Sequence, residues 1–119
     1  MTAQSPRRRA LIYVCMTRYG DVHRVLQELR DYAERRGWDI ADEYADRNGL
    51  ATAEAERPQF HLARAAIAAG HAQIFLTKYD TMLGLCAAEA AELPDFERWL
   101  GEHGAEVHAA WRPRVAAQA

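Results

Sequence analysis

The feature that most constrains the fold is an uninterrupted apolar run over residues 10–16. Its branched and aromatic side chains favour a β-strand. A strand with one face in water alternates apolar and polar residues, whereas this run is apolar at every position. That pattern is typical of strands in parallel sheets that helices cover on both faces. The run therefore predicts a central strand in a layered α/β domain.

The rest of the chain alternates between helical and strand patterns. Between residues 21 and 36 the apolar positions recur at helical spacing, and Gly37 follows two arginines at the end of that helix. Pro58 suits the first turn of a second helix, and Gly70 marks its end. The other predicted elements are strands over 38–44, 72–77 and 105–110, a helical segment over 81–93, and, separated from it by Pro94, a helix with Phe96, Trp99 and Leu100 that Gly101 or Gly104 ends.

Strands that alternate with helices predict a mainly parallel sheet with right-handed crossovers and helices on both faces, a three-layer α/β fold. In such sheets, functional residues gather beyond the carboxyl ends of the strands, where the loops leave. Thr17, Asp46 and Asp80 occupy such positions. The segment over 46–56 is predicted to be a loop of about ten residues, longer than the roughly two to six that usually join a strand to a helix, and loops of that length are often functional.

Length and charge bound the organisation and the partners. A chain of 119 residues and 13.5 kDa suits one domain, which we expect over 10–110, with a flexible basic N-terminus over 1–9 and a tail over 111–119. The formal net charge of -2 gives no overall attraction to nucleic acid, because phosphate binding depends on lysine and arginine. Arg7, Arg8 and Arg9 form the dense basic run. They are either a solvated lead-in to the first strand or a weak, local contact to DNA phosphates.

Several classes of protein are disfavoured. No apolar stretch reaches the roughly 18 to 20 residues of a membrane span, and the N-terminus lacks the pattern of a secretory signal. Cys15 and Cys86 have no metal-like spacing and fit a reducing compartment. The 5 histidines show no tight ligand pairing. We therefore expect a cytoplasmic protein that binds no metal and no cofactor and does not enter a membrane.

Three short stretches, in their order and spacing, resemble the motifs of the catalytic domain of serine recombinases, the family of resolvases, invertases and large serine integrases. Residues 13–17 resemble Tyr-x-Arg-x-Ser, residues 56–60 resemble Asp-Arg-x-x-Phe/Leu, and residues 78–83 resemble Lys-x-Asp-Arg-Leu-x-Arg. The similarity covers residues 10–84 well and 94–110 loosely. It implies a resolvase-like fold with the strand order 2-1-3-4.

The resemblance also implies a site for phosphoryl transfer. In that family a serine attacks a DNA phosphodiester while arginines hold the phosphate, because a planar guanidinium group can meet two of its charged oxygens. The nucleophile position falls on Thr17, the arginine of the second motif on Arg57, and the acidic residue of the third motif on Asp80. The other expected arginines fall on Cys15, Thr81 and Gly84, and an expected glutamine falls on Val25.

Each of these residues also has an ordinary structural interpretation. Thr17 suits a helix cap or a bond to a loop amide, and Asp80 suits a helix cap. Arg57 suits a surface position, and Cys15 suits a small apolar filler in a strand. The arginines that remain to replace the missing guanidinium groups are Arg18, Arg47 and Arg64.

Because one of four expected arginines remains and threonine replaces serine, we interpret the chain as a catalytically impaired relative that acts as a binding or regulatory module. Active relatives continue into a long helix and a DNA-binding domain, so we expect affinity to come from a protein partner or a second copy, with weak DNA contact. One alternative is an active or conditionally active DNA strand-transfer enzyme with Thr17 as nucleophile. Another is a small-molecule or protein-binding domain that shares only the architecture.

Overall fold

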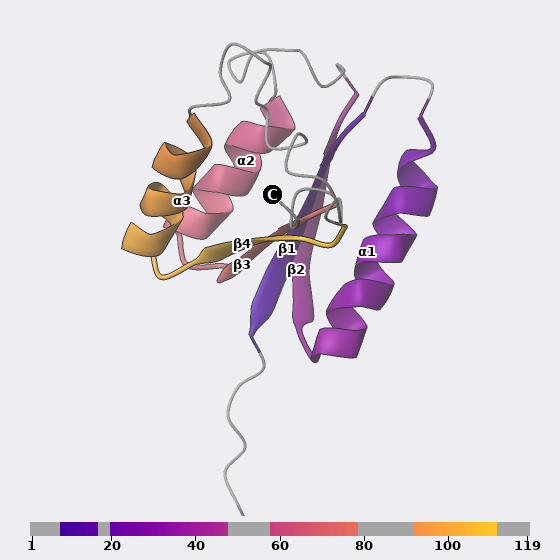
Figure 1. Ribbon diagram of the computed structural model, residues 1–119, viewed down its shortest axis with the longest axis horizontal. Coiled ribbons are helices and arrows are strands. Elements are labelled where there is room, and N and C mark those ends of the chain that lie inside the picture. The colour runs from indigo at the N-terminus through magenta and orange to yellow at the C-terminus, as the bar shows by residue number, and fades with distance from the viewer. Residues whose placement is uncertain (1–7, 17–19, 48–57, 79–91, 112–119) are drawn as a thin grey trace, which may run out of the picture.

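The fold is a four-stranded parallel sheet between two layers of helices (Figure 1). The computed structural model describes residues 8–16, 20–47, 58–78 and 92–111. The sheet order is β2-β1-β3-β4, so the predicted order and the central place of the first strand are confirmed. Helix α1 covers one face, and α2 and α3 cover the other. The elements are β1 (Arg9–Cys15), α1 (Val22–Arg36), β2 (Asp39–Asp46), α2 (Pro58–Ala68), β3 (Ile74–Thr77), α3 (Glu92–Glu102) and β4 (Glu106–Ala109).

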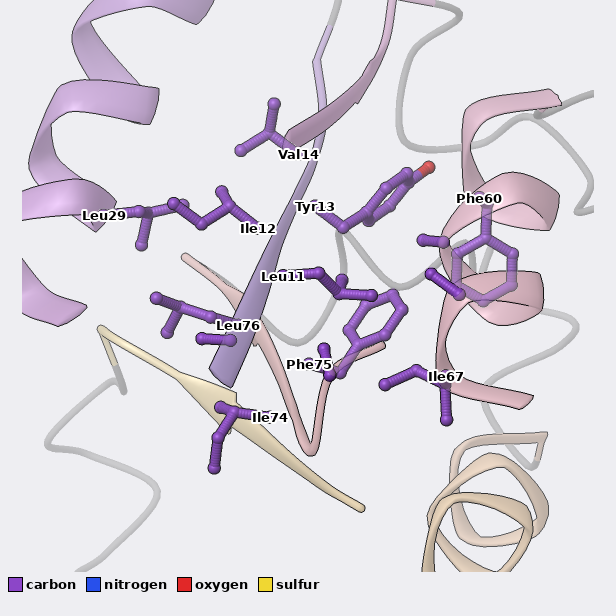
Figure 2. Close-up of a cluster of buried hydrophobic side chains, with 14 of the residues drawn as sticks. Leu11, Ile12, Tyr13, Val14, Leu29, Phe60, Ile67, Ile74, Phe75 and Leu76 are labelled. Atoms are coloured by element: carbon purple, nitrogen blue, oxygen red, sulfur yellow. The ribbon is translucent and has the colours of Figure 1, made fainter. Parts of the chain in front are cut away.

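Strand β1 is buried at every residue after Arg9, which is why its sequence carries no polar alternation. Successive side chains of a strand point to opposite faces. Figure 2 shows Ile12 and Val14 on the side of α1, and Leu11 and Tyr13 on the side of α2. The strand therefore contributes to the core on both sides of the sheet.

Helix α1 begins and ends as its sequence predicts. The carboxylate of Asp21 accepts a hydrogen bond from the N–H of Arg24 at 3.0 Å, which satisfies one of the free amides of the first turn. Gly37 ends the helix at a φ of 76°, a left-handed conformation that glycine adopts at little cost. The N–H of Trp38 then bonds to the carbonyl oxygen of Ala33 at 2.9 Å. This bond reverses the direction of the chain, and β2 begins at the next residue, Asp39.

Strand β2 runs to Asp46, beyond the predicted end at residue 44. Asp46 was expected to open a loop, but it pairs in register with Cys15 and is buried. Asp46 can be buried at the end of the strand because its carboxylate accepts hydrogen bonds from Tyr13, Gln59 and Phe60. Of the segment over 46–56, residues 48–56 lie outside the described residues.

Helix α3 differs from its prediction at its start. Pro94 was expected to separate two helices, yet it lies in the first turn of α3. The first four N–H groups of a helix have no partner within it, so a proline there costs no hydrogen bond. Gly101 lies inside the helix, and Gly104 follows its end with a φ of 71°. Residues 81–91 of the predicted helical segment lie outside the described residues.

None of the described helices is long and apolar enough to cross a bilayer.

Candidate functional site

The carboxyl edge of the sheet is the candidate site. In the parallel sheet the strands end side by side at Cys15, Asp46, Thr77 and Ala109. Of the residues that the sequence predicts here, Thr17, Arg57 and Asp80 lie outside the described residues, as do the arginine positions Thr81 and Gly84. The described residues at this edge are those that end the strands and those that begin α2.

Asp46 is the best-connected polar side chain at this edge. Its Oδ2 accepts hydrogen bonds from the hydroxyl of Tyr13 at 2.9 Å and from the N–H of Phe60 at 3.0 Å. Its Oδ1 accepts a hydrogen bond from the N–H of Gln59 at 3.1 Å. Gln59 and Phe60 belong to the first turn of α2, whose amides carry partial positive charge. The buried carboxylate is therefore the N-terminal cap of α2.

The main chain of Asp46 makes a further connection. Its carbonyl oxygen accepts a hydrogen bond from the N–H of Met16 at 3.0 Å. Met16 directly precedes Thr17 in the sequence, and α2 begins directly after Arg57. One residue thus bonds both to the segment that leads into Thr17 and to the helix that follows Arg57.

The role of Asp46 was not predicted from the sequence, although its place at a strand end was. The available signal was an aspartate that closes a strand, followed by a helix with proline at its first position and no acidic residue in its first turn. Such a helix needs an acceptor from elsewhere for its free amides. The partner lies 13 residues away from Gln59 in the sequence, which a local capping pattern does not reveal.

Cys15 and Val25 occupy positions where the resemblance implies polar groups. Cys15 is fully buried at the end of β1, beside Asp46 in the sheet register. Val25 is buried in the face of α1 that contacts the core. Both side chains are small, neutral and enclosed, so neither supplies a group that binds phosphate.

Two of the described cations near this edge, Lys78 and Arg64, contact other groups. Lys78 follows β3, and its Nζ lies 2.7 Å from a carboxylate oxygen of Glu28 on α1. The guanidinium group of Arg64 lies 4.5 Å from the centre of the Trp99 ring, which directs it toward α3. Arg18 lies outside the described residues, and Arg47 is exposed just beyond β2. Arg64 is therefore directed away from the carboxyl edge, and Arg47 is the described arginine that lies there.

Thr77 adds a buried hydroxyl at the same edge. Its side chain is completely enclosed, and its Oγ1 has no hydrogen-bond partner among the described residues. Phe75, two positions earlier, lies on the α2 side of the sheet in Figure 2, so the alternation of a strand places Thr77 on that side as well. An enclosed hydroxyl without a partner costs stability.

The basic run lies at the amino ends of the strands, opposite the carboxyl edge. Arg8 bonds through Nη1 to Glu106 at 2.8 Å, and Arg9 donates from Nε to the carbonyl oxygen of His71 at 2.9 Å. Hydrogen bonds from His108 and Arg8 lower the pKa of Glu106 below its ordinary value. Arg7 lies outside the described residues. The structure thus separates Arg9 from Cys15, at the other end of the same strand, by the length of β1.

Within the described ranges, no three side chains of histidine, cysteine, aspartate or glutamate lie close enough together to hold a metal ion.

Comparison with solved structures identifies the same fold in serine recombinase catalytic domains. The C-terminal catalytic domain of ISC1926 TnpA, an IS607-like serine recombinase, matches with a TM-score of 0.75 and 17% identity over 92% of this chain and 74% of that chain. The N-terminal catalytic domain of TP901-1 integrase matches with a TM-score of 0.72 and 19% identity over 87% of this chain and 77% of that chain. A serine recombinase from Sulfolobus solfataricus matches with a TM-score of 0.59 and 13% identity over 94% and 76%.

Sequence comparison alone gives no such link. No protein-family model matches the chain, and no curated protein matches it in sequence. The likeness is therefore one of fold, and it agrees with the resemblance that the three motifs carry.

Proposed function

We propose that the chain is a degenerate serine recombinase catalytic domain, related to site-specific DNA recombination, that acts as a binding or regulatory module. The domain occupies residues 10–110, between a basic N-terminal segment and a C-terminal tail. The fold that it shares with solved serine recombinase domains supports this proposal, together with the order of the three motifs.

The observation that carries the proposal is the burial of Cys15. A transferring phosphoryl group holds its charge on non-bridging oxygens, and guanidinium groups stabilise that charge as it develops. At the position of the first-motif arginine, the chain has an enclosed, neutral thiol side chain. Losing one positioned donor typically costs on the order of 100- to 1000-fold in rate. The sequence replaces two further arginines, with Thr81 and Gly84, so DNA strand transfer should fall below detection.

A direct test is the covalent protein–DNA intermediate. The purified chain is incubated with supercoiled plasmid, quenched in denaturant and resolved on a denaturing gel, beside an active serine recombinase with its own DNA site. The expected result is neither plasmid cleavage nor a shifted band. An adduct that persists in the wild type and disappears in Thr17→Ala would overturn catalytic impairment.

The alternative is an active or conditionally active enzyme with Thr17 as nucleophile. The bonds of Asp46 favour it, because they join Met16 to the first turn of α2, and these segments adjoin Thr17 and Arg57. Under this alternative, Thr17→Ser should keep or increase adduct formation, since serine presents the same hydroxyl with less steric hindrance. Arg57→Ala should abolish it. Equal absence of adduct in the wild type and all three variants would exclude the alternative for that substrate.

A further inference from the structure

Helix α2 is apolar on more than the side that packs on the sheet. Its buried residues are Phe60, Ala63, Ala66 and Ile67. Leu62 and Ala65 are exposed on another side, and Ala69 continues that line just beyond the helix. Apolar surface that is exposed and contiguous often marks a site of contact with another molecule. In the described part of the chain, nothing covers this second side.

The exposed side of α2 forms one wall of a groove, and the edge strand β2 forms the other. The groove consists of two adjoining hollows of about 410 and 530 Å³ that share Asp42, Tyr44, Ala66 and His71. Ile40, 37% exposed, lines the first hollow, and Leu62, 52% exposed, lines the second. Of the three large apolar side chains that are exposed among the described residues, these two border the groove.

The strand wall of the groove resists the addition of another strand. Successive residues of a strand turn their backbone N–H and C=O groups to opposite sides. The backbone of Asp46 faces β1, because its carbonyl oxygen accepts a hydrogen bond from the N–H of Met16. The backbone N–H of Glu43, three residues earlier, therefore faces the open edge of the sheet. This N–H is already bonded to the Asp42 carboxylate at 2.8 Å. The β-bulge between Ala10 and Leu11 also interrupts the register of this pair of strands. These are the features by which sheet edges avoid pairing.

The charge of the second hollow favours a cationic partner, because Asp42 is the one aspartate, glutamate, lysine or arginine among the described residues that line it. The first hollow is lined by Arg9 as well as Asp42, and the Nε of Arg9 donates to the carbonyl oxygen of His71. Asp42 is exposed and borders both hollows, and no cationic side chain in the described ranges pairs with it. Burial, together with the charge of Asp42, raises the pKa of the Tyr44 phenol. Asp39, which lines neither hollow, is a second exposed acidic residue of the same strand. A second copy that docked through the same groove would bring this acidic strand close to its own counterpart.

We propose that the groove between α2 and β2 binds an amphipathic helix of a protein partner, with a narrow apolar face that contacts Ile40 and Leu62 and a lysine or arginine that pairs with Asp42. The alanines of α2 allow such a helix to approach closely, and helix-in-groove binding does not require free strand amides. The inference deepens the proposed role as a binding module, and it does not depend on whether DNA is bound.

The test is a selection from a displayed library of helical peptides in which the apolar face and its flanking positions are randomised, with the full chain as bait. Enriched peptides are expected to carry leucine, isoleucine, methionine or phenylalanine on one face and lysine or arginine beside it. Synthetic copies, measured by fluorescence anisotropy, should bind Leu62→Lys at least about tenfold more weakly. Asp42→Asn should weaken binding by roughly fivefold and flatten its dependence on salt.

Controls separate this site from general stickiness and from misfolding. Trp111 is 51% exposed but does not line the groove, so Trp111→Ser should bind the peptides as the wild type does. Ala65→Glu is a second groove variant at an exposed position, and circular dichroism checks that each variant is folded. Failure to enrich peptides, a lack of basic preference, or binding unchanged in the groove variants would overturn the proposal. So would a concentration-dependent dimer that Leu62→Lys dissociates, because the occupant would then be a second copy. The assay contains no DNA, so its outcome is independent of the adduct test.

Discussion

Tyr13 and Asp46 meet inside the protein, where the tyrosine hydroxyl donates a 2.9 Å hydrogen bond to a carboxylate that also caps α2. This bond links the central strand, the edge strand and a helix on one face of the sheet. Because the carboxylate has three donors, its removal affects more than one element.

We expect Asp46→Ala to lower the free energy of unfolding by roughly 2 to 4 kcal/mol, since it removes a helix cap and leaves the buried Tyr13 hydroxyl without its acceptor. Tyr13→Phe should cost less, about 1 to 2 kcal/mol, because both amides of α2 keep their bonds. Urea denaturation measures both. Asp21→Ala, which removes the exposed cap of α1, is the matched control at about 1 kcal/mol. Equal losses for Asp46→Ala and Asp21→Ala would contradict the linking role of Asp46.

Thr77 offers a substitution that should stabilise the protein. Thr77→Val keeps the branched shape and removes a buried hydroxyl that has no partner in the described part of the chain. We expect the free energy of unfolding to rise by up to about 1 kcal/mol. Thr77→Ser keeps the hydroxyl, loses a methyl group and should destabilise. If Thr77→Val destabilised the protein, the hydroxyl would have a hydrogen-bond partner outside the described residues.

Glu106 should make a small contribution to the dependence of the free energy of unfolding on pH. The pKa of its carboxyl group is lowered from 4.5 by hydrogen bonds with His108 and Arg8. A group with a lowered folded pKa stabilises the protein above its unfolded pKa, and this stabilisation is lost as the pH falls through the folded value. Glu106→Gln should therefore reduce the loss of stability below a pH of about 4.5. The effect should be well under 1 kcal/mol, because both partners of the Arg8 pair are about half exposed.

The carboxyl carbon of Glu106 can be followed directly by NMR. Its titration midpoint should move upward, toward 4.5, in His108→Ala and in Arg8→Ala. An unchanged midpoint in both variants would show that these neighbours do not set the pKa.

DNA binding should be weak and confined to low salt. Each neutralised phosphate contributes a slope of about 0.9 in a plot of log affinity against log salt concentration, so Arg7, Arg8 and Arg9 together give a slope of less than about 3. Replacing all three with alanine should abolish binding, while Arg57→Ala should change it little. Because Arg8 is paired with Glu106, Glu106→Gln should strengthen binding at low salt. Submicromolar binding at physiological salt, insensitive to the triple substitution, would place the DNA contact elsewhere.

Much of the fold follows from the sequence because burial leaves a pattern in it. The apolar run of β1 predicted a central strand, and the helical spacing up to Gly37 predicted the ends of α1. Pro94 was misinterpreted because a proline in a first helical turn and a proline that separates helices are alike in sequence. The spacing of Leu62 also fits an apolar face of α2, yet its side chain is exposed, because the periodicity of apolar residues does not show which sides of a helix other elements cover.

The candidate site was less predictable. Its motif residues are recognised by order and spacing, whereas the contacts around them depend on partners far apart in sequence. Asp46 and Phe60 are joined across 14 residues and Tyr13 and Asp46 across 33, and no local pattern predicts such pairs. The roles that the motifs suggest for Thr17, Arg57 and Asp80 stay predictions.

The length of β1 sets a scale for any DNA complex. Its 7 residues, at about 3.3 Å each, separate Arg9 from Cys15 by roughly 20 Å. B-form DNA rises about 3.4 Å per base pair, so the same distance corresponds to about six base-pair steps. A duplex that touched the basic run while presenting a phosphate to the opposite edge would have to lie along the strand direction. A duplex that crossed the sheet would reach one edge and miss the other.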